Sequence, residues 1–256
     1  MEARFERERQ AHDEIARDID PTALGPPQLG PADRWMLENS GISPGVRVLD
    51  LGCGQGDLTI YAIERGAEVT AIDVSPGMVS VTEQRVRATH PGARPVFVVA
   101  PFELARLPAG AYDLVIGRFI LHHLDVPRAA AGLAQVLRGG GKAVFLENSG
   151  RNGLLIFARD HIAGRFGVPR LGTEDEHPLL ADDISELERH FGTVELDHPS
   201  FDFFTILDRQ VFRYKVPLVS RMLAALDQLA HRVPALRKYS YRVVVTLRSP
   251  TRRADT

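Results

Sequence analysis

The segment from residue 46 to residue 66 constrains the fold more than any other part of the sequence. The apolar, β-branched run 46–51 predicts a buried strand, and it leads directly into Gly52-Cys53-Gly54-Gln55-Gly56. A helical stretch then runs from residue 57 to residue 65 and ends at Gly66, a residue typical of helix C-caps. A glycine-rich turn between a strand and a helix lets a ligand approach the backbone and meet the N–H groups at the helix start. The sequence therefore predicts a ligand site at the carboxyl end of this strand.

Strand and helix patterns alternate along the residues after the glycine-rich turn. Ser75 and Pro76 open one helix as its N-cap and first residue, and another helix is predicted over 126–137. Further strands are predicted at 68–73, 96–100, 112–117, 142–147, 193–196 and 241–247. Alternation of this kind is typical of βαβ units. The predicted fold class is therefore α/β: a doubly wound, seven-stranded, mostly parallel sheet with helical lid insertions.

The chain divides into four parts on this interpretation. Residues 1–43 form an N-terminal helical cap, and residues 44–198 form the ligand-binding core. Residues 199–240 form a helical lid insertion, and residues 241–256 form the final strand and a tail. We expect the cap and the lid to close a pocket at the carboxyl ends of the strands, where open parallel sheets bind their ligands.

Charge and cysteine usage exclude several classes of protein. The chain has 31 basic and 33 acidic residues, so its net charge of −2 argues against a dedicated nucleic-acid binder. Cys53 is the only cysteine, which excludes an intrachain disulfide and a multi-cysteine metal site. The polar N-terminus does not resemble a signal peptide, and no apolar run approaches the roughly 20 residues that span a bilayer. We expect a cytoplasmic protein without a transmembrane segment, whose partner is a small molecule and not a nucleic acid.

Basic residues accumulate toward the end of the sequence. From Arg209 onward there are 11 basic and two acidic residues. This pattern indicates a solvated positive face, an anchor for an anionic group of the substrate, or contact with a membrane surface. The sequence leaves these three interpretations open, and it also leaves the oligomeric state open.

Two carboxylates accompany the glycine-rich turn. Asp73 ends the next predicted strand, seventeen positions after Gly56, where a carboxylate can accept hydrogen bonds from both hydroxyls of a ribose. The turn departs from the G-x-G-x-x-G pattern of dinucleotide sites, because its third glycine comes one position early and Asp57 stands in the usual place. Asp50 lies two residues before the first glycine. A carboxylate there disfavours a pyrophosphate and favours a cationic or zwitterionic ligand.

Four stretches of the sequence together resemble the class I S-adenosylmethionine-dependent methyltransferases. They read VLDLGCGQG (48–56), VTAIDVSPGMV (69–79), YDLVIGRFILHHL (112–124) and LRGGGKAVFLEN (137–148). The resemblance implies a Rossmann-like methyltransferase fold, S-adenosyl-L-methionine as the cofactor and methyl transfer to a small, moderately apolar acceptor. A quinone precursor, a polyketide, an isoprenoid and a lipid are the acceptor types that we consider, and O-, N- and C-methylation all stay open.

The resemblance also assigns residues to the cofactor. It implies that the glycine-rich turn lines the methionine moiety, that Asp50 steers the amino group and that Asp73 holds the ribose. The third strand lacks the Gly-Asp ending usual in this family, so we expect Phe102 to stack on the adenine and Glu103 to replace the missing acid. The implied cofactor residues are Asp50, Gly52, Cys53, Gly54, Gly56, Asp73, Val74, Met78, Pro101, Phe102, Glu103, Gly117 and Arg118.

Two residues near strand ends are candidates for catalysis. His123 and Glu147 are both predicted at or just past the carboxyl ends of strands that face the pocket. A histidine is the natural base for an oxygen or nitrogen acceptor, because its ordinary pKa lies near neutrality. A carboxylate would instead stabilise the positive charge that develops on a carbon acceptor.

Two other functions compete with methyl transfer, and one segment raises the question of a metal site. The protein could be a cofactor-binding but inactive subunit that scaffolds a partner enzyme, or a NAD-dependent dehydrogenase of the same architecture. The carboxylate-rich segment 172–178 could bind a divalent metal, but its acids are consecutive and rarely converge on one ion. We therefore predict no metal ligand, and Asp57 in the turn argues against the dehydrogenase.

Overall fold

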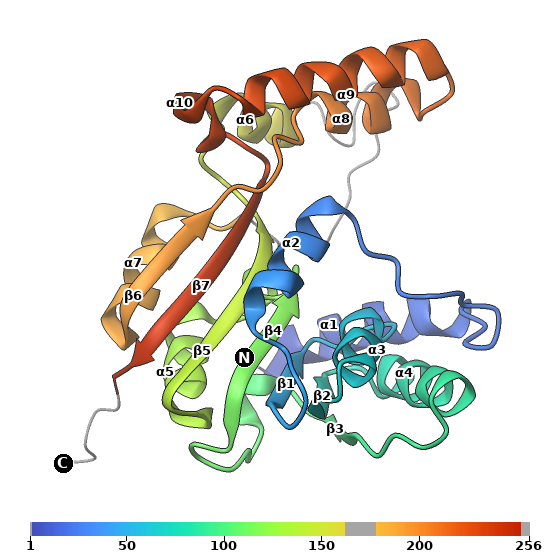
Figure 1. The fold of residues 1–256 in the computed structure, drawn as a ribbon, viewed down its shortest axis with the longest axis vertical. Helices are drawn as coiled ribbons and strands as arrows, with labels where there is room; N and C mark the ends of the chain where they lie inside the picture. The colour runs from blue at the N-terminus through green and yellow to red at the C-terminus, as the bar shows by residue number, and fades with distance from the viewer. Residues whose placement is uncertain (1, 162–177, 252–256) are drawn as a thin grey trace.

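The computed structural model describes residues 2–161 and 178–251 (Figure 1). Within these residues the centre of the molecule is a seven-stranded sheet in the order β3-β2-β1-β4-β5-β7-β6. The strands are β1 (Arg47–Leu51), β2 (Glu68–Asp73), β3 (Val96–Val99), β4 (Tyr112–Arg118), β5 (Leu137–Asn148), β6 (Phe191–Asp197) and β7 (Arg242–Pro250). Strands β1 to β5 pair in parallel, whereas β7 runs antiparallel to both β5 and β6. The predicted doubly wound, mostly parallel α/β class is confirmed.

Helices and short helical turns connect the strands. In chain order they are α1 (Glu2–Arg17), α2 (Pro31–Ser40), α3 (Asp57–Glu64), α4 (Pro76–Thr89), η1 (Phe102–Leu104), η2 (Leu121–His123), α5 (Val126–Val136), α6 (Gly153–His161), α7 (Ala181–His190), α8 (Phe204–Leu207), η3 (Asp208–Phe212), α9 (Pro217–His231) and α10 (Pro234–Arg237). None of the helices in the described part of the chain combines the length and the apolar character needed to cross a bilayer.

The strands bury apolar side chains on both faces of the sheet. Val48, Leu114 and Ile116 pack against α2 and α3 on one face. Their neighbours Leu49 and Val115 pack against α5 and α7 on the other face. Successive residues of a strand point to opposite faces, so a strand covered on both sides reads as a continuous apolar run. This is why the run 46–51 was recognisable as a buried strand.

Local sequence signals fix the turns that surround the site. Ser75 caps α4 as predicted, because its hydroxyl oxygen accepts a hydrogen bond from Met78 N at 2.9 Å and Pro76 is the first helical residue. Gly56 precedes α3 with φ of +84°, in the left-handed region that favours glycine. A Cβ at this position would also lie 2.8 Å from Thr82 Cγ2, so the turn before α3 can approach α4 this closely because Gly56 has no side chain.

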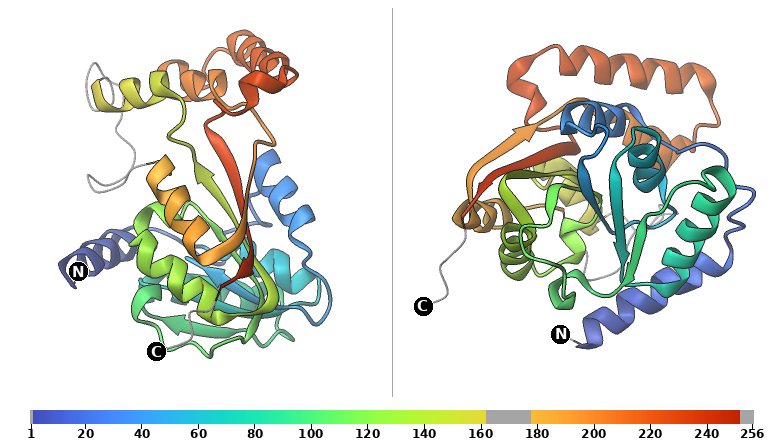
Figure 2. Two further views of the ribbon diagram at one scale, coloured as in Figure 1. Left: turned by 90° about the vertical axis from the view of Figure 1, so that its left-hand side faces the viewer. Right: turned by 60° about the horizontal axis from the view of Figure 1, so that its bottom comes forward.

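The residues between β6 and β7 form α8, η3, α9 and α10, in a layer beyond the carboxyl end of β5 (Figure 1, top; Figure 2). Helix α6 lies in the same layer in both figures. At the other end of the sequence, α1 packs against α4 beside the parallel half of the sheet. These two additions to the sheet are the elements that can surround a ligand at the strand ends.

Candidate cofactor and acceptor site

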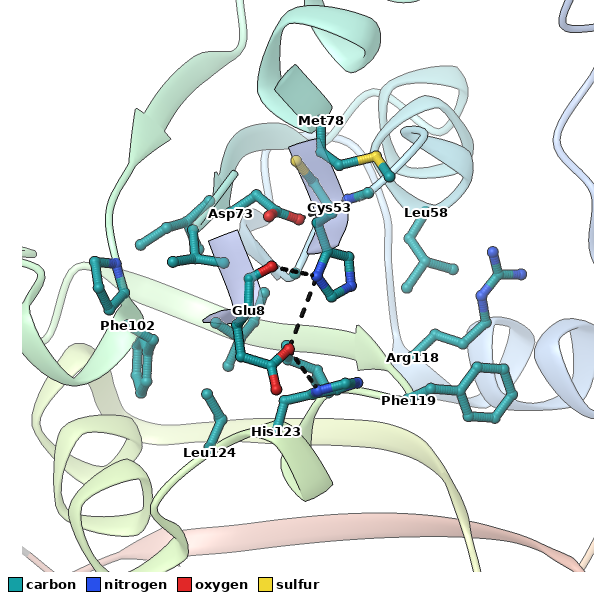
Figure 3. A pocket seen from close by; sticks show the side chains of 18 of the residues that line it. Glu8, Cys53, Leu58, Asp73, Met78, Phe102, Arg118, Phe119, His123 and Leu124 are labelled. Atoms are coloured by element: carbon teal, nitrogen blue, oxygen red, sulfur yellow. Dashed lines mark hydrogen bonds and ion pairs between the residues drawn. The ribbon is translucent and has the colours of Figure 1, made fainter. Parts of the chain in front are cut away.

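A cavity of about 530 Å³ opens at the carboxyl ends of β1, β2 and β4 (Figure 3). This volume lies within the range of about 300–1,000 Å³ that small-molecule sites occupy. Ten of the predicted cofactor residues line the cavity: Gly52, Cys53, Gly54, Asp73, Val74, Met78, Pro101, Phe102, Glu103 and Arg118. Three others do not line it. They are Asp50, Gly56 and Gly117, and they lie in or next to β1, α3 and β4.

The glycine-rich turn gives this cavity a floor of bare backbone. Gly54 adopts φ of +50°, and a Cβ on it would meet no atom within 4 Å. A side chain at Gly54 would therefore project into the cavity and occupy space that a ligand can use. Cys53, the neighbouring residue, is 6% exposed, and burial raises the pKa of its thiol well above the ordinary range. The thiol therefore stays protonated, and Cys53 acts as a small wall residue.

Asp73 connects the turn to the next strand. Its Oδ2 accepts a hydrogen bond from Gly54 N at 3.0 Å, and its Oδ1 accepts one from Ser75 N at 2.9 Å. Burial raises the pKa of Asp73, and these two backbone donors offset part of that effect. The side chain lines the cavity from a fixed position, so the predicted carboxylate is available at the end of β2.

Asp50 lies behind the wall of the cavity, fully buried in β1. Thr59 Oγ1 donates a hydrogen bond of 2.5 Å to Asp50 Oδ2. The other oxygen, Oδ1, is buried and has no hydrogen-bond partner among the described residues. Burial raises the pKa of Asp50 from an ordinary value of 3.8 to about 7. A buried acceptor without a donor is costly, so this oxygen fits a cationic group that would complete the site.

Glu103 offers a second acceptor of the same kind. Its Oε1 accepts hydrogen bonds from Arg4 Nη2 at 2.5 Å and from Asp125 N at 3.0 Å. Its Oε2 is buried, and within the described part of the chain it has no partner. Glu103 lines the cavity from within η1, so Oε2 can accept a hydrogen bond from an amino group of a ligand. Phe102, beside it, is both part of the apolar core and part of the cavity wall.

Two arginines and two aspartates form a hydrogen-bonded network next to the glycine-rich turn. Arg118 donates to Asp57 Oδ2 at 2.9 Å and to Asp33 Oδ1 at 3.3 Å. Arg85, whose side chain is 1% exposed, donates to Asp57 Oδ1 at 2.9 Å and to the carbonyl oxygen of Gln55 at 2.7 Å. Asp57, which stands where dinucleotide sites have a glycine, therefore joins α3 to β4 and α4. The charged side chains of this network lie outside residues 52–56, and they hold the glycine-rich turn in place.

Helix α1 supplies a part of the wall for which the sequence analysis named no residue. Phe5, Glu8 and His12 all line the cavity, and their spacing places them on one face of the helix. Glu8 Oε2 lies 3.0 Å from Nδ1 of His123, the predicted catalytic histidine (Figure 3). Burial favours the neutral acid, but the hydrogen bond and charge of His123, with the charges of His12 and Arg4, hold the pKa of Glu8 below its ordinary value. Glu8 is therefore an ionised carboxylate that orients the imidazole.

The same residues have the donor types of a metal site. In the part of the chain that the structure describes, Glu8, His12 and His123 are the one group whose possible ligand atoms all lie within 4.8 Å of one another. Two histidines and a carboxylate can ligate transition metals. The direct contact of Glu8 with His123 is a simpler reason for their proximity, and the absence of metal ligands stays a prediction. Residues 172–177 of the acidic segment lie outside the described residues.

Glu147, the second predicted catalytic residue, is placed differently. It is fully buried and does not line the cavity. Its Oε1 accepts hydrogen bonds from Ile120 N and Leu121 N, both at 2.8 Å, and its Oε2 lies 2.8 Å from His122 Nδ1. Glu147 therefore fixes the turn between β4 and η2 that carries His123. The geometry assigns it a positioning role, and its predicted contact with the acceptor has no support in this arrangement.

The structure also differs from the expectation that the lid, residues 199–240, closes the cavity. Among the described residues, none beyond Leu124 lines the cavity, so the helices between β6 and β7 do not contribute to its wall. The N-terminal cap does contribute to the wall, as expected, because Phe5, Glu8 and His12 of α1 line the cavity. The turn after β4 adds Phe119 and Ile120, and Phe119 has φ of +55°, which is uncommon for a side chain of this size.

Comparisons with known proteins agree with this geometry. A family model described as "Methyltransferase domain" matches residues 48–141. Aklanonic acid methyltransferase DauC of Streptomyces sp. (strain C5) is 35% identical over 153 residues, which are 58% of this chain and 68% of that protein. A ubiquinone biosynthesis O-methyltransferase of Nitrosococcus oceani is 30% identical over 174 residues, which are 66% of this chain and 72% of that protein. The chain spans about half the length of several other curated relatives. It spans 38% of the length of a malonyl-[acyl-carrier protein] O-methyltransferase from Serratia marcescens.

A solved structure extends the likeness of fold over most of the chain. Geranyl diphosphate C-methyltransferase from Streptomyces coelicolor A3(2), in complex with Mg²⁺, geranyl diphosphate and S-adenosyl-L-homocysteine, has a TM-score of 0.61 at 12% identity. The alignment covers 96% of this chain and 98% of that chain. At this identity the likeness supports the fold alone.

Proposed function

The chain belongs to the class I S-adenosylmethionine-dependent methyltransferases, and we propose that it methylates a hydroxyl group of a small, largely apolar metabolite. The observation that carries this proposal is the pair of Glu8 and His123, 3.0 Å apart, in the same cavity as the glycine-rich turn and Asp73. A base oriented by a carboxylate suits an acceptor that must lose a proton.

The residues present fit S-adenosyl-L-methionine, the cofactor of this family. We propose that Asp50 Oδ1 accepts a hydrogen bond from the ammonium group and that Glu103 Oε2 accepts one from the adenine amino group, since both oxygens are buried and no described residue donates to either. Asp73 would accept the ribose hydroxyls, and the open space above Gly54 would leave room for the methionine moiety. When bound, the cofactor supplies an electrophilic methyl group on a sulfonium.

The wall that remains for the acceptor is mostly apolar. Phe5 from α1, Phe119 and Ile120 after β4, and Leu124 after η2 line the cavity around His123. Apolar walls with few polar groups exclude water and hold a reactant in one orientation, which is a large part of the rate enhancement in displacement reactions. These walls support an apolar acceptor of the quinone or polyketide type. Among the relatives are a ubiquinone biosynthesis O-methyltransferase and an aklanonic acid methyltransferase.

His123 would handle the proton of the acceptor. Its Nδ1 lies 3.0 Å from Glu8 Oε2. In the tautomer that carries its proton on Nδ1, toward this carboxylate, Nε2 would carry the lone pair. As the acceptor oxygen bonds to the methyl carbon, Nε2 would take the hydroxyl proton, and Glu8 would stabilise the imidazolium that forms. Glu147 would keep this histidine in place through Ile120, Leu121 and His122.

Release of S-adenosylhomocysteine in the presence of an acceptor tests the function. The purified protein is incubated with S-adenosylmethionine and a panel of phenols, enols, amines and alkenes of similar size. We expect S-adenosylhomocysteine to form with phenolic or enolic hydroxyl compounds, in amounts equal to the methylated product, and not without an acceptor. If the cofactor binds but no member of the panel releases S-adenosylhomocysteine, the inactive scaffold is the better interpretation. Methylation of amines or alkenes alone would contradict the hydroxyl acceptor.

Cofactor affinity is expected to fall in acid because of Asp50. Its pKa of about 7 means that the free protein protonates this carboxyl below neutrality. If only the ionised carboxylate accepts the ammonium group, the Kd rises about 25-fold between pH 7.5 and pH 5.5. Isothermal titration calorimetry across this range measures the effect.

Asp50→Asn is the matched control for the pH effect. Asparagine keeps an acceptor for Thr59 Oγ1 but cannot ionise. The variant should bind weakly at every pH, with a Kd that changes less than threefold across the same range. A wild-type Kd that is flat with pH, or an Asp50→Asn variant that keeps the full pH dependence, would remove Asp50 from the cofactor site.

A further inference from the structure

The helices between β6 and β7 carry most of the exposed apolar side chains of this protein. Residues 199–240 hold 12 of the 19 large apolar side chains that are exposed in the described part of the chain. Leu218 is 69% exposed, and Met222 and Leu229 are each 59% exposed. Exposed apolar surface concentrated in one region marks a site of contact with a protein or a membrane. The exposed apolar surface of residues 199–240 therefore indicates a binding partner.

Helix α9 presents these side chains as a stripe. Leu218, Met222, Leu226 and Leu229 recur at the spacing of one helix face, and all four are exposed. The opposite face is fixed by Asp227, which is 6% exposed and accepts hydrogen bonds from the backbone N–H groups of residues 203–205 at 2.8–3.0 Å. Because Asp227 anchors α9 to α8, the apolar stripe is held outward and cannot turn into the protein.

The surface charges of this region are mostly positive. Residues 199–240 contain seven basic residues and three acids, of which Asp208 and Asp227 are buried and Asp202 is half-buried. Their net charge is +4, which leaves −6 for the rest of a chain whose total is −2. Helical spacing places Arg221 and Arg232 along the border of the apolar stripe on α9, and both are exposed. The exposed face of the insertion is therefore apolar and cationic.

Two other occupants fit this face less well than a membrane. A two-fold dimer would place this positively charged face of one copy against the same face of the other, which is repulsive. Closure over the cavity would leave the stripe outward, given the anchor at Asp227, and no described residue of the insertion lines the cavity. An anionic lipid surface matches both the apolar stripe and the positive border.

We propose that residues 199–240 dock onto anionic lipid bilayers, with α9 lying in the plane of the headgroups. Leu218, Met222 and Leu229 enter the boundary between headgroups and acyl chains, and Arg221 and Arg232 contact lipid phosphates. The negative remainder of the chain faces away from the membrane. The inference rests on this surface alone and does not depend on the proposed methyl transfer.

Flotation of the full chain with lipid vesicles tests the proposal. Vesicles of phosphatidylcholine containing about one third phosphatidylglycerol should bind the protein, and vesicles of phosphatidylcholine alone should bind it at least tenfold less. Raising the NaCl concentration should weaken binding, and Arg221→Gln and Arg232→Gln should each lower the partition coefficient about fivefold. Met222→Glu should lower it at least tenfold, because a carboxylate would enter an apolar and anionic environment.

Val96→Glu is the matched control, because Val96 is 57% exposed but lies on β3 at the far edge of the sheet. It should bind vesicles like the wild type, and both variants should show the wild-type circular dichroism spectrum and cofactor Kd. Equal binding to neutral and anionic vesicles, or none to either, would overturn the proposal. So would a dimer in analytical ultracentrifugation that Met222→Glu dissociates, because the stripe would then be an interface between copies.

Discussion

The His123→Ala variant is expected to lose about two to three orders of magnitude in kcat while it binds S-adenosylmethionine as tightly as the wild type. The His123 side chain lines the cavity and is the group that we propose takes the acceptor proton, and its Nδ1 lies 3.0 Å from Glu8 Oε2. Asp50, Asp73 and Glu103, which carry the proposed cofactor contacts, are unchanged by the substitution. Steady-state kinetics with an acceptor from the panel, together with calorimetry of cofactor binding, separate the two effects.

Two further variants make this result specific. His12→Ala removes the other histidine of the cavity, whose ring centroid lies 5.7 Å from that of His123, and it should lower kcat less than tenfold. Glu8→Gln should lower kcat about tenfold and shift the acidic limb of the pH–rate profile to lower pH, because a neutral side chain no longer stabilises the imidazolium. If His123→Ala keeps more than a tenth of the wild-type kcat, the reaction depends on positioning alone and the base assignment is wrong.

Arg85→Met is expected to lower the free energy of unfolding by about 3 kcal/mol. Arg85 is almost fully buried, and its guanidinium donates to Asp57, to the Gln55 carbonyl and, at 2.8 Å, to the Gly25 carbonyl. Methionine fills much of the same volume but donates no hydrogen bond, so two backbone carbonyls lose a donor and Asp57 keeps only part of its neutralising charge. Chemical denaturation followed by circular dichroism measures the loss.

Arg87→Met, two residues along the same helix, is the control for this loss. Arg87 is 74% exposed and pairs only with Glu83 among the described residues, an interaction that contributes less than about 1 kcal/mol at a surface. The unfolding midpoint of the Arg87→Met variant should stay close to that of the wild type. Equal midpoints for the two variants would show that the network around Asp57 adds nothing to the stability of the glycine-rich turn.

The cofactor half of the site was predictable because its determinants are local. Gly54 and Asp73 are placed by a strand, a turn and a helix that follow one another in the sequence, and both line the cavity as expected. Even Glu103, which departs from the usual family pattern, lies where the missing acid was expected. Its assignment to the adenine, like that of Asp50 to the ammonium group, stays a prediction until a ligand is bound.

The remainder of the site depends on contacts between distant segments, which periodicity does not specify. Glu8 reaches His123 from a helix more than one hundred residues earlier in the chain, and the one sequence signal for it was the shared face of Phe5, Glu8 and His12. Glu147 stands at a strand end, as predicted, but its side chain points to backbone donors and not to the cavity. A strand end fixes where a residue lies, and the neighbouring turn decides what it contacts.

The position of β7 has a consequence for synthesis of the protein. This strand follows every other strand in the sequence, yet it lies inside the sheet and gives β6 its pairing partner. On the ribosome, a nascent chain can complete the parallel half with the glycine-rich turn while the edge of β5 is still uncovered. Uncovered edges template pairing with other chains, so this edge is the point at which nascent molecules are most exposed to aggregation.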